Sequence, residues 1–204
     1  MSSTDRLFSS AEQRALLELA RAAIGERLFN DGRLERTLDA TTRSPGLERR
    51  SGLFVTLKQG AEAHIPSREA TLRGCIGTME SAKPLYREVV EMAPKAAFDD
   101  PRFAPLSNDE FGEVMISLSI LTPMTRIPDW REITIGRDGV QLVRGASRSV
   151  FLPQVAEEQR WDRQRLLTQL SLKAGLDPGA WRTGELYTFQ AESFGETDHF
   201  ASGG

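Results

Sequence analysis

The 204-residue chain has one cysteine, two histidines and no long run of apolar residues. A single cysteine cannot form a disulfide within the chain, so a secreted fold built on disulfides is not expected. A zinc site needs several cysteine or histidine ligands, which this chain does not supply. A membrane-spanning helix needs about 18 or more consecutive apolar residues, and no window approaches that length. These absences favour a cytoplasmic protein without a zinc site.

Several signals of common functions are also missing. The N-terminus begins Met-Ser-Ser-Thr-Asp-Arg and lacks the basic start and apolar stretch of a signal peptide. The net charge of −3 gives no bulk attraction to nucleic acid or to an anionic membrane. The chain has no phosphate-binding loop, dinucleotide-binding glycine pattern, nucleophile elbow or zinc-protease motif. No cofactor is therefore identified, and neither a substrate nor an oligomeric state follows.

What the chain does have is the composition of a globular domain. Hydrophobic residues make up 39% and charged residues 27%. A chain of this length buries about two-thirds of its unfolded surface, so it needs no covalent staple. We expect one domain at residues 10–196, a frayed N-terminus at 1–9 and a flexible tail at 197–204.

Hydrophobic periodicity predicts an α+β fold. Helices are expected at residues 10–29, opened by a Ser10–Gln13 capping box, from Pro84 until Pro94 kinks or ends it, and at 163–174. Strands are expected at residues 52–58, 71–78, 113–121, 132–136, 140–143, 149–152 and 185–194. Residues 30–51 read as a loop or extended arm. No strand–helix–strand alternation persists, which favours an antiparallel sheet flanked by helices.

Two connections organise the predicted strands. Residues 52–58 and 71–78 are expected to form a hairpin with a long loop. The dipeptide Asp138-Gly139 is a strong turn signal and predicts a second hairpin between 132–136 and 140–143.

The strand at 71–78 carries the first candidate site, Leu72-Arg73-Gly74-Cys75-Ile76-Gly77. Alternate residues of a strand share a face, so Arg73, Cys75 and Gly77 should point together while Leu72, Gly74 and Ile76 face the core. A guanidinium beside a thiol favours the reactive thiolate. The glycines leave room for a substrate or a second chain to approach the backbone. The alternative is a cysteine packed as a small hydrophobe and glycines that mark a bulge.

The turn at residues 99–103 carries the second candidate. Asp100 could orient Arg102 or a catalytic partner, or bind a cation, whereas the alternative is a capped turn with a surface ion pair. A cysteine–histidine pair would have to use His64, in the loop before the cysteine strand, or His199, in the expected tail.

Three stretches resemble the AMMECR-type domain, known in bacteria as protein A of the AmmeMemoRadiSam system. They are Gly52-Leu-Phe-Val-Thr-Leu57, Leu72-Arg-Gly-Cys-Ile-Gly-Thr78 and Ala96-Ala-Phe-Asp-Asp-Pro-Arg-Phe103. Further pieces follow in the family's order, at residues 135–139, 151–155, 173–176 and Trp181. The resemblance covers about residues 10–196.

The resemblance implies an α+β fold with two unequal subdomains, the larger containing both chain ends. It also implies association with a Memo-type protein and a radical S-adenosylmethionine protein. It implies no settled reaction, so whether the chain is an enzyme stays open. Ser171 stands where some relatives have a second cysteine, which rules out a two-cysteine redox mechanism within this chain.

The leading hypothesis is a cysteine-containing component of a modification system. Cys75 would be a nucleophile or attachment point, and Arg73 would activate it or hold an anionic group. The residues expected to bind around them are Thr56, Gly74, Gly77, Asp100 and Arg102. One alternative is a non-catalytic module that binds a protein or small ligand. Another is a nucleic-acid-modifying protein with a local basic patch near the two arginines.

Overall fold

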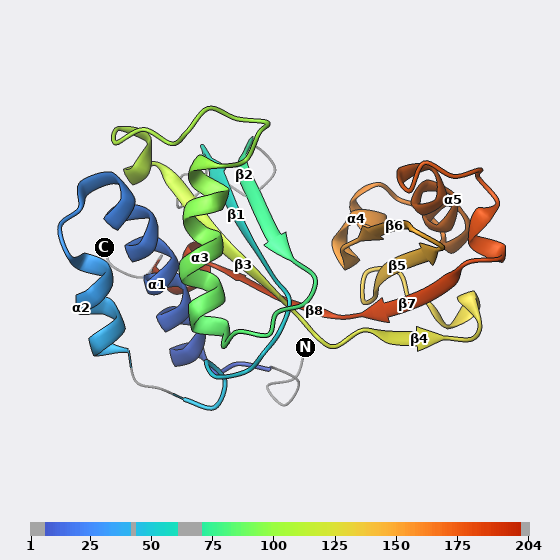
Figure 1. Cartoon of the computed structure of the whole chain (residues 1–204), viewed down its shortest axis with the longest axis horizontal. Coiled ribbons are helices and arrows are strands. Elements are labelled where there is room, and N and C mark those ends of the chain that lie inside the picture. The colour runs from blue at the N-terminus through green and yellow to red at the C-terminus, as the bar shows by residue number, and fades with distance from the viewer. Residues whose placement is uncertain (1–6, 42–43, 61–70, 201–204) are drawn as a thin grey trace. The chain divides into compact units, whose positions relative to one another are not determined.

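The computed structural model describes residues 7–41, 44–60 and 71–200 (Figure 1). The fold is α+β, as predicted, and it divides into two unequal units. The larger unit draws on both ends of the chain, from residues 1–120 and 192–204, and the smaller is formed by residues 121–191.

The larger unit combines a four-stranded sheet with helices. Its strands, in spatial order, are β2 (Thr71–Thr78), β1 (Leu53–Gln59), β3 (Val114–Leu121) and β8 (Ala191–Gly195). Its helices are α1 (Ser10–Phe29), α2 (Arg33–Ala40), α3 (Leu85–Phe98) and α6 (Glu196–Phe200). Both β2 and β3 are antiparallel to β1, and β1 and β2 form the predicted hairpin.

The core of this unit lies between one face of the sheet and helices α1 and α3 (Figure 1). Leu17 of α1, Val89 of α3 and Leu57 of β1 are all inaccessible to solvent. Along β3 the alternating residues Val114, Ile116, Leu118 and Ile120 are buried, as predicted, and Ser119 and Leu121 near its end are buried as well. The opposite face of the sheet therefore carries the remaining residues of each strand.

Three details of the helices differ from prediction. The capping box of α1 is formed by Ser9 and Glu12, one residue earlier than expected, because Gln13 is buried and donates to Glu192. Helix α2 occupies part of the expected loop, and it escapes prediction because none of its residues is fully buried. Helix α3 continues to Phe98 without ending at Pro94.

Packing explains how α3 passes Pro94. Ala93, Ala96 and Ala97 are all buried around it. The close contacts made by these small side chains offset the backbone hydrogen bond that proline cannot donate.

The smaller unit has its own sheet and core. Its strands, in spatial order, are β4 (Thr125–Ile127), β7 (Glu185–Phe189), β5 (Gly139–Arg144) and β6 (Ser147–Phe151). Its helices are α4 (Pro153–Glu158) and α5 (Arg163–Lys173). Its largest buried side chains include Leu142, Leu167 and Trp181.

Two strand predictions in and near this unit are wrong. The hairpin at Asp138-Gly139 does not form, because the Asp138 carboxylate is buried and accepts the Thr134 N–H at 2.8 Å, closing a turn. Strand β5 instead pairs with β6 across Gly145, which has φ +61°. The single strand expected at 185–194 is divided at Gln190 into β7 and β8, which belong to different sheets.

Parts of the expected frayed ends are ordered in the described residues. Phe8 is 2% exposed and belongs to the core of the larger unit. The expected tail begins as helix α6, and His199 Nε2 lies 2.9 Å from Gln13 Oε1. No helix in the described part of the chain is both long enough and apolar enough to cross a membrane.

Replacing the interior proline of α3 should stabilise the protein. Pro94→Ala restores a backbone N–H inside the helix, and we expect a gain of about 1–3 kcal/mol after allowing for the more flexible unfolded chain. Thermal unfolding followed by circular dichroism measures the change. Pro84→Ala is the matched control, because Pro84 occupies the N-cap and should give no gain. If Pro94→Ala and Pro84→Ala change the thermal stability equally, the missing N–H of Pro94 is not what limits the stability of α3.

Candidate functional site

Strand β2 forms one edge of the larger unit's sheet and carries the Arg73–Gly77 motif. Cys75 lies directly opposite Thr56 of β1, and the Thr56 hydroxyl donates to Cys75 Sγ at 3.4 Å. The cysteine is partly exposed and does not belong to the buried core. The thiol thus lies on the sheet face opposite α1 and α3.

A β-bulge at Arg73 changes the predicted facing of the strand. Leu57 pairs with Gly74 but the next residue, Lys58, pairs with Leu72, so Arg73 is the extra residue. One inserted residue moves the side chains of the residues before it to the opposite faces of the sheet. Leu72 is consequently 40% exposed and does not face the core as predicted.

Both motif glycines are required by the protein's own packing. A Cβ on Gly74 would lie 2.1 Å from the Ala96 carbonyl oxygen of α3. A Cβ on Gly77 would lie 2.2 Å from the Leu53 carbonyl oxygen of β1. The missing side chains therefore make room for α3 and β1, and no ligand is needed to explain the glycines.

The turn after α3 closes the free edge of β2 at Cys75. The Asp100 carboxylate accepts the Cys75 backbone N–H at 2.8 Å, and Arg102 Nη2 donates to the Cys75 carbonyl at 3.3 Å. Asp100 also accepts the Arg102 backbone N–H and two N–H groups of its guanidinium. The pair thus supplies Cys75 with the acceptor and donor that a neighbouring strand would give it.

The charge states of this pair follow from its geometry. Asp100 is 4% exposed, and the Arg102 guanidinium is the main cause that holds the pKa of its carboxyl well below the usual range. Asp100 raises the pKa of Arg102 in turn, and the Cys75 thiol contributes a smaller part. Asp100 is therefore ionised at physiological pH, so it holds the Cys75 backbone by accepting its N–H and is not suited to donating protons.

Arg73 is held by a residue that the sequence did not point to. Its Nε donates to Glu110 Oε1 at 2.8 Å and its Nη2 donates to Glu110 Oε2 at 3.1 Å. The same Nη2 lies 3.4 Å from the Pro105 carbonyl. In the described residues no hydrogen bond joins Arg73 to the Cys75 thiol, and the guanidinium bonded to Cys75 is that of Arg102. Because Arg73 is the extra residue of the bulge, it bonds Glu110, and Arg102 takes the place beside Cys75 that was predicted for Arg73.

The Arg73–Glu110 pair is largely shielded from solvent. The Arg73 side chain is 11% exposed, and its Nη1 is buried without a partner among the described residues. The Arg73 hydrogen bonds are the main cause that lowers the pKa of Glu110 to about 2, helped by the Ser107 backbone N–H.

Small polar side chains extend the site across the sheet. Ser117 of β3 lies opposite Thr56, which is itself opposite Cys75. In the neighbouring row, the Ser119 and Ser193 hydroxyl groups are 2.8 Å apart. The buried alternation of β3 is the signal that could have placed Ser117 and Ser119 on this face. Cys75, Thr56 and Ser117 thus bring a thiol and two hydroxyl groups together on one face of the sheet.

Among the described residues, neither a histidine nor a metal-ligand cluster is found beside Cys75. His64 lies outside the described residues, and His199 contacts Gln13 and Phe194. Within residues 7–41, 44–60 and 71–200, no three histidine, cysteine, aspartate or glutamate side chains gather as a metal site.

Comparison with known proteins gives consistent results. The sequence pattern of the AMMECR1 family matches residues 17–194. A protein of Thermofilum pendens is 40% identical over 199 residues, covering 92% of each chain. A protein of Pyrococcus furiosus is 38% identical over 188 residues, covering 89% of this chain and 86% of the relative.

A solved structure is similar across the whole fold. The crystal structure of an uncharacterized protein from Pyrococcus horikoshii has a TM-score of 0.76 and 32% sequence identity. The match covers 93% of this chain and 94% of that chain.

Gly74→Ala should destabilise the larger unit. The new methyl group would meet a backbone carbonyl that cannot move without shifting α3, so we expect a loss of about 1–3 kcal/mol or more in urea unfolding. Gly112→Ala is the matched control, because a Cβ added there would have no neighbour within 4 Å. A Gly74 variant as stable as the Gly112 variant would contradict the packing explanation.

Glu110→Gln should make stability less sensitive to acid. The folded pKa of about 2 lies below the ordinary value of 4.5, so the Glu110 contribution is complete above the ordinary value and is lost as pH falls toward the folded one. We expect the variant to be less stable than wild type by about 1–3 kcal/mol near neutral pH.

The difference in unfolding free energy between wild type and Glu110→Gln should narrow as pH falls from about 5 to about 2.5, measured by urea unfolding along a pH series. Glu113→Gln is the control, because Glu113 is exposed and outside the Arg73 contact. A difference in unfolding free energy that stays constant with pH would show that the Arg73–Glu110 ion pair is not the cause of the lost stability.

Proposed function

We propose that this chain, which belongs to the AMMECR1 family, is a cysteine-bearing component of a modification system and acts through Cys75. In this proposal Cys75 is the nucleophile or attachment point. A Memo-type protein and a radical S-adenosylmethionine protein would act with it.

One observation carries the proposal. The Cys75 backbone is fixed on both sides, by β1 and by the Asp100–Arg102 pair, while its side chain stays partly exposed outside the core. A cysteine used only for packing is usually among the most buried residues of a protein. A rigid backbone that presents an accessible thiol instead suits a reacting group, because little freedom remains to be lost when a substrate binds.

The neighbours of the thiol support a role for its anion. The Arg102 guanidinium is bonded to the Cys75 carbonyl, and Thr56 donates a hydrogen bond to the sulfur. A hydroxyl donor stabilises negative charge that develops on sulfur during a reaction, and Arg102, which is paired with Asp100, holds the Cys75 backbone in place. Arg73 would then act indirectly, since Glu110 holds it at the bulge beside the cysteine. Thr56 and Arg102 are thus the residues proposed to tune the reaction.

A second candidate is a non-catalytic binding module. Its contact surface would be the sheet face that carries Cys75, Thr56 and Ser117. The nucleic-acid alternative has less support, because Arg73 and Arg102 each face a carboxylate and so offer no free basic patch.

Alkylation of the native chain tests whether Cys75 can react. The chain has one cysteine, so uptake of iodoacetamide measured by intact mass reports on that residue alone. We expect modification of the folded protein at a rate at least comparable to that of the urea-unfolded chain. Thr56→Val should slow it several-fold, since the sulfur loses its donor. Modification only after unfolding would end the nucleophile proposal.

Cys75→Ser and Cys75→Ala separate the two candidate functions. If Cys75 reacts, both variants should lose product formation in cells that contain the Memo-type and radical S-adenosylmethionine proteins, yet still bind the Memo-type protein in a pull-down. If the chain is only a binding module, Cys75→Ser should keep full function. Circular dichroism of each variant checks that the fold is intact.

A further inference from the structure

A large cavity among the described residues lies away from Cys75, along helix α1. It is a groove of about 1110 Å³, which we call the α1–α2 groove. Its floor is α1, one wall is α2, and the start of β3 contributes to the other side. Cavities of several hundred to about a thousand Å³ are the usual size for small-molecule sites.

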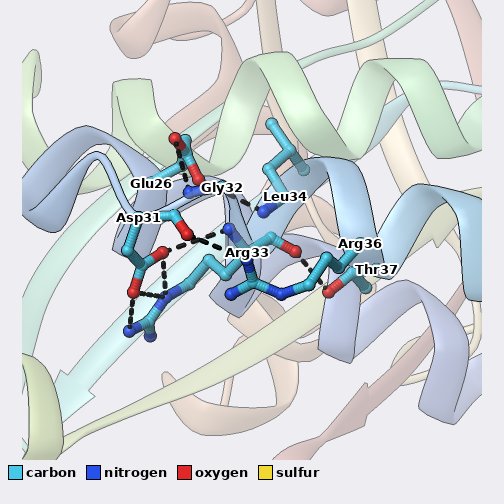
Figure 2. A network of polar contacts seen from close by, with 7 residues as sticks. All are labelled: Glu26, Asp31, Gly32, Arg33, Leu34, Arg36 and Thr37. Atoms are coloured by element: carbon cyan, nitrogen blue, oxygen red, sulfur yellow. Dashed lines mark hydrogen bonds and ion pairs between the residues drawn. The ribbon is translucent and has the colours of Figure 1, made fainter.

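Side-chain hydrogen bonds hold the N-terminal end of helix α2 in place. Figure 2 shows Arg33 and Asp31 turned toward each other, while the Glu26 carboxylate accepts the backbone N–H groups of Gly32 and Leu34. The Arg33 guanidinium also lies 5.1 Å from the Phe29 ring. These contacts lock the α1–α2 turn at one end of the groove.

The rest of α2 is loosely packed. None of its residues is fully buried, and a second cavity of about 480 Å³ lies along its other side. Leu38 is its contact with the core. A helix held at one end with space on both sides can shift to accommodate an occupant without breaking the core.

Most charges along the groove are already neutralised. Arg21 pairs with Glu196, and Arg33 pairs with Asp31. The Glu12 carboxylate accepts hydrogen bonds from Ser44 and Gly46. The two arginines therefore have little charge left for a ligand, whereas Glu12 keeps its negative charge.

Arg36 is different. In the described residues its guanidinium makes no ion pair, and its Nη1 donates to the Asp31 backbone carbonyl at 2.9 Å. That bond positions the group while its other N–H donors stay available (Figure 2). The remaining lining is largely apolar, and its members are Ala11, Ala15, Ala22, Ala40, Leu47 and Met115. Glu12 and the exposed Glu18 are also in the lining, and both are carboxylates that would repel an anion.

We propose that the α1–α2 groove binds an amphipathic anion, a molecule with an apolar body and one carboxylate or phosphate group. The acidic group pairs with Arg36 and the apolar body lies along the alanines of α1. This site is independent of Cys75 and of the function proposed for it.

Fluorescence titration of the full chain with dansylundecanoic acid tests the proposal. Saturable binding at one site is expected, and the uncharged methyl ester of the probe should bind about tenfold more weakly, as loss of one charged contact predicts. Decanoate and decyl phosphate are added as competitors. Displacement by either supports the site and identifies the preferred acidic group, whereas displacement by neither overturns it.

Four surface variants test the location of the binding site and the charge of its ligand. Ala40→Trp fills the groove from an exposed position and should abolish binding, whereas Glu35→Trp, on the same helix but outside both cavities, should not. Arg36→Gln should weaken binding about tenfold, and Glu18→Gln should leave it unchanged or tighter.

If Ala40→Trp and Glu35→Trp bind the probe equally well, the probe does not occupy the α1–α2 groove and the proposed location is wrong. Weaker binding by Glu18→Gln than by Arg36→Gln would overturn the charge of the ligand. Cys75→Ala should bind the probe like wild type, so the outcome does not depend on the reaction proposed for the cysteine.

Discussion

The Asp100 carboxylate is the interaction on which the candidate site depends. It is buried, yet it accepts N–H groups from the Cys75 backbone, the Arg102 backbone and the Arg102 guanidinium. A buried charge is costly unless it is fully paired, so removing Arg102 would leave the buried Asp100 carboxylate uncompensated. This requirement links the end of α3, the edge of the sheet and the cysteine into one rigid arrangement.

Much of the fold could be predicted because it follows from local patterns. Strict alternation identified β3, and continuous β-forming residues identified the β1–β2 hairpin that brings Thr56 opposite Cys75. Asp100 and Arg102 were singled out from their turn, although only the structure shows that they bind the Cys75 backbone. Their tertiary role depends on where α3 ends relative to β2, which no local pattern encodes.

Two of the features that escaped prediction, the Arg73 bulge and the break at Gln190, depend on contacts between distant segments. The bulge at Arg73 shifts the strand by one residue, and its partner Glu110 lies far along the chain. Helix α2 lacks a buried stripe. Gln190 divides an apparently continuous run of β-forming residues because its two halves join different sheets. Asp138 forms a buried acceptor where its dipeptide signals a hairpin.

The edge position of β2 has a consequence for how the protein behaves in solution. An uncovered edge strand can recruit the strand of another molecule and begin aggregation. At Cys75 the backbone groups that would do so already bind Asp100 and Arg102, and the Arg73 bulge interrupts the regular ladder beside them. The residues that present the thiol thereby also protect the sheet from self-association. Members of the AMMECR1 family that kept the cysteine but lost this turn would have to cover the same edge in another way.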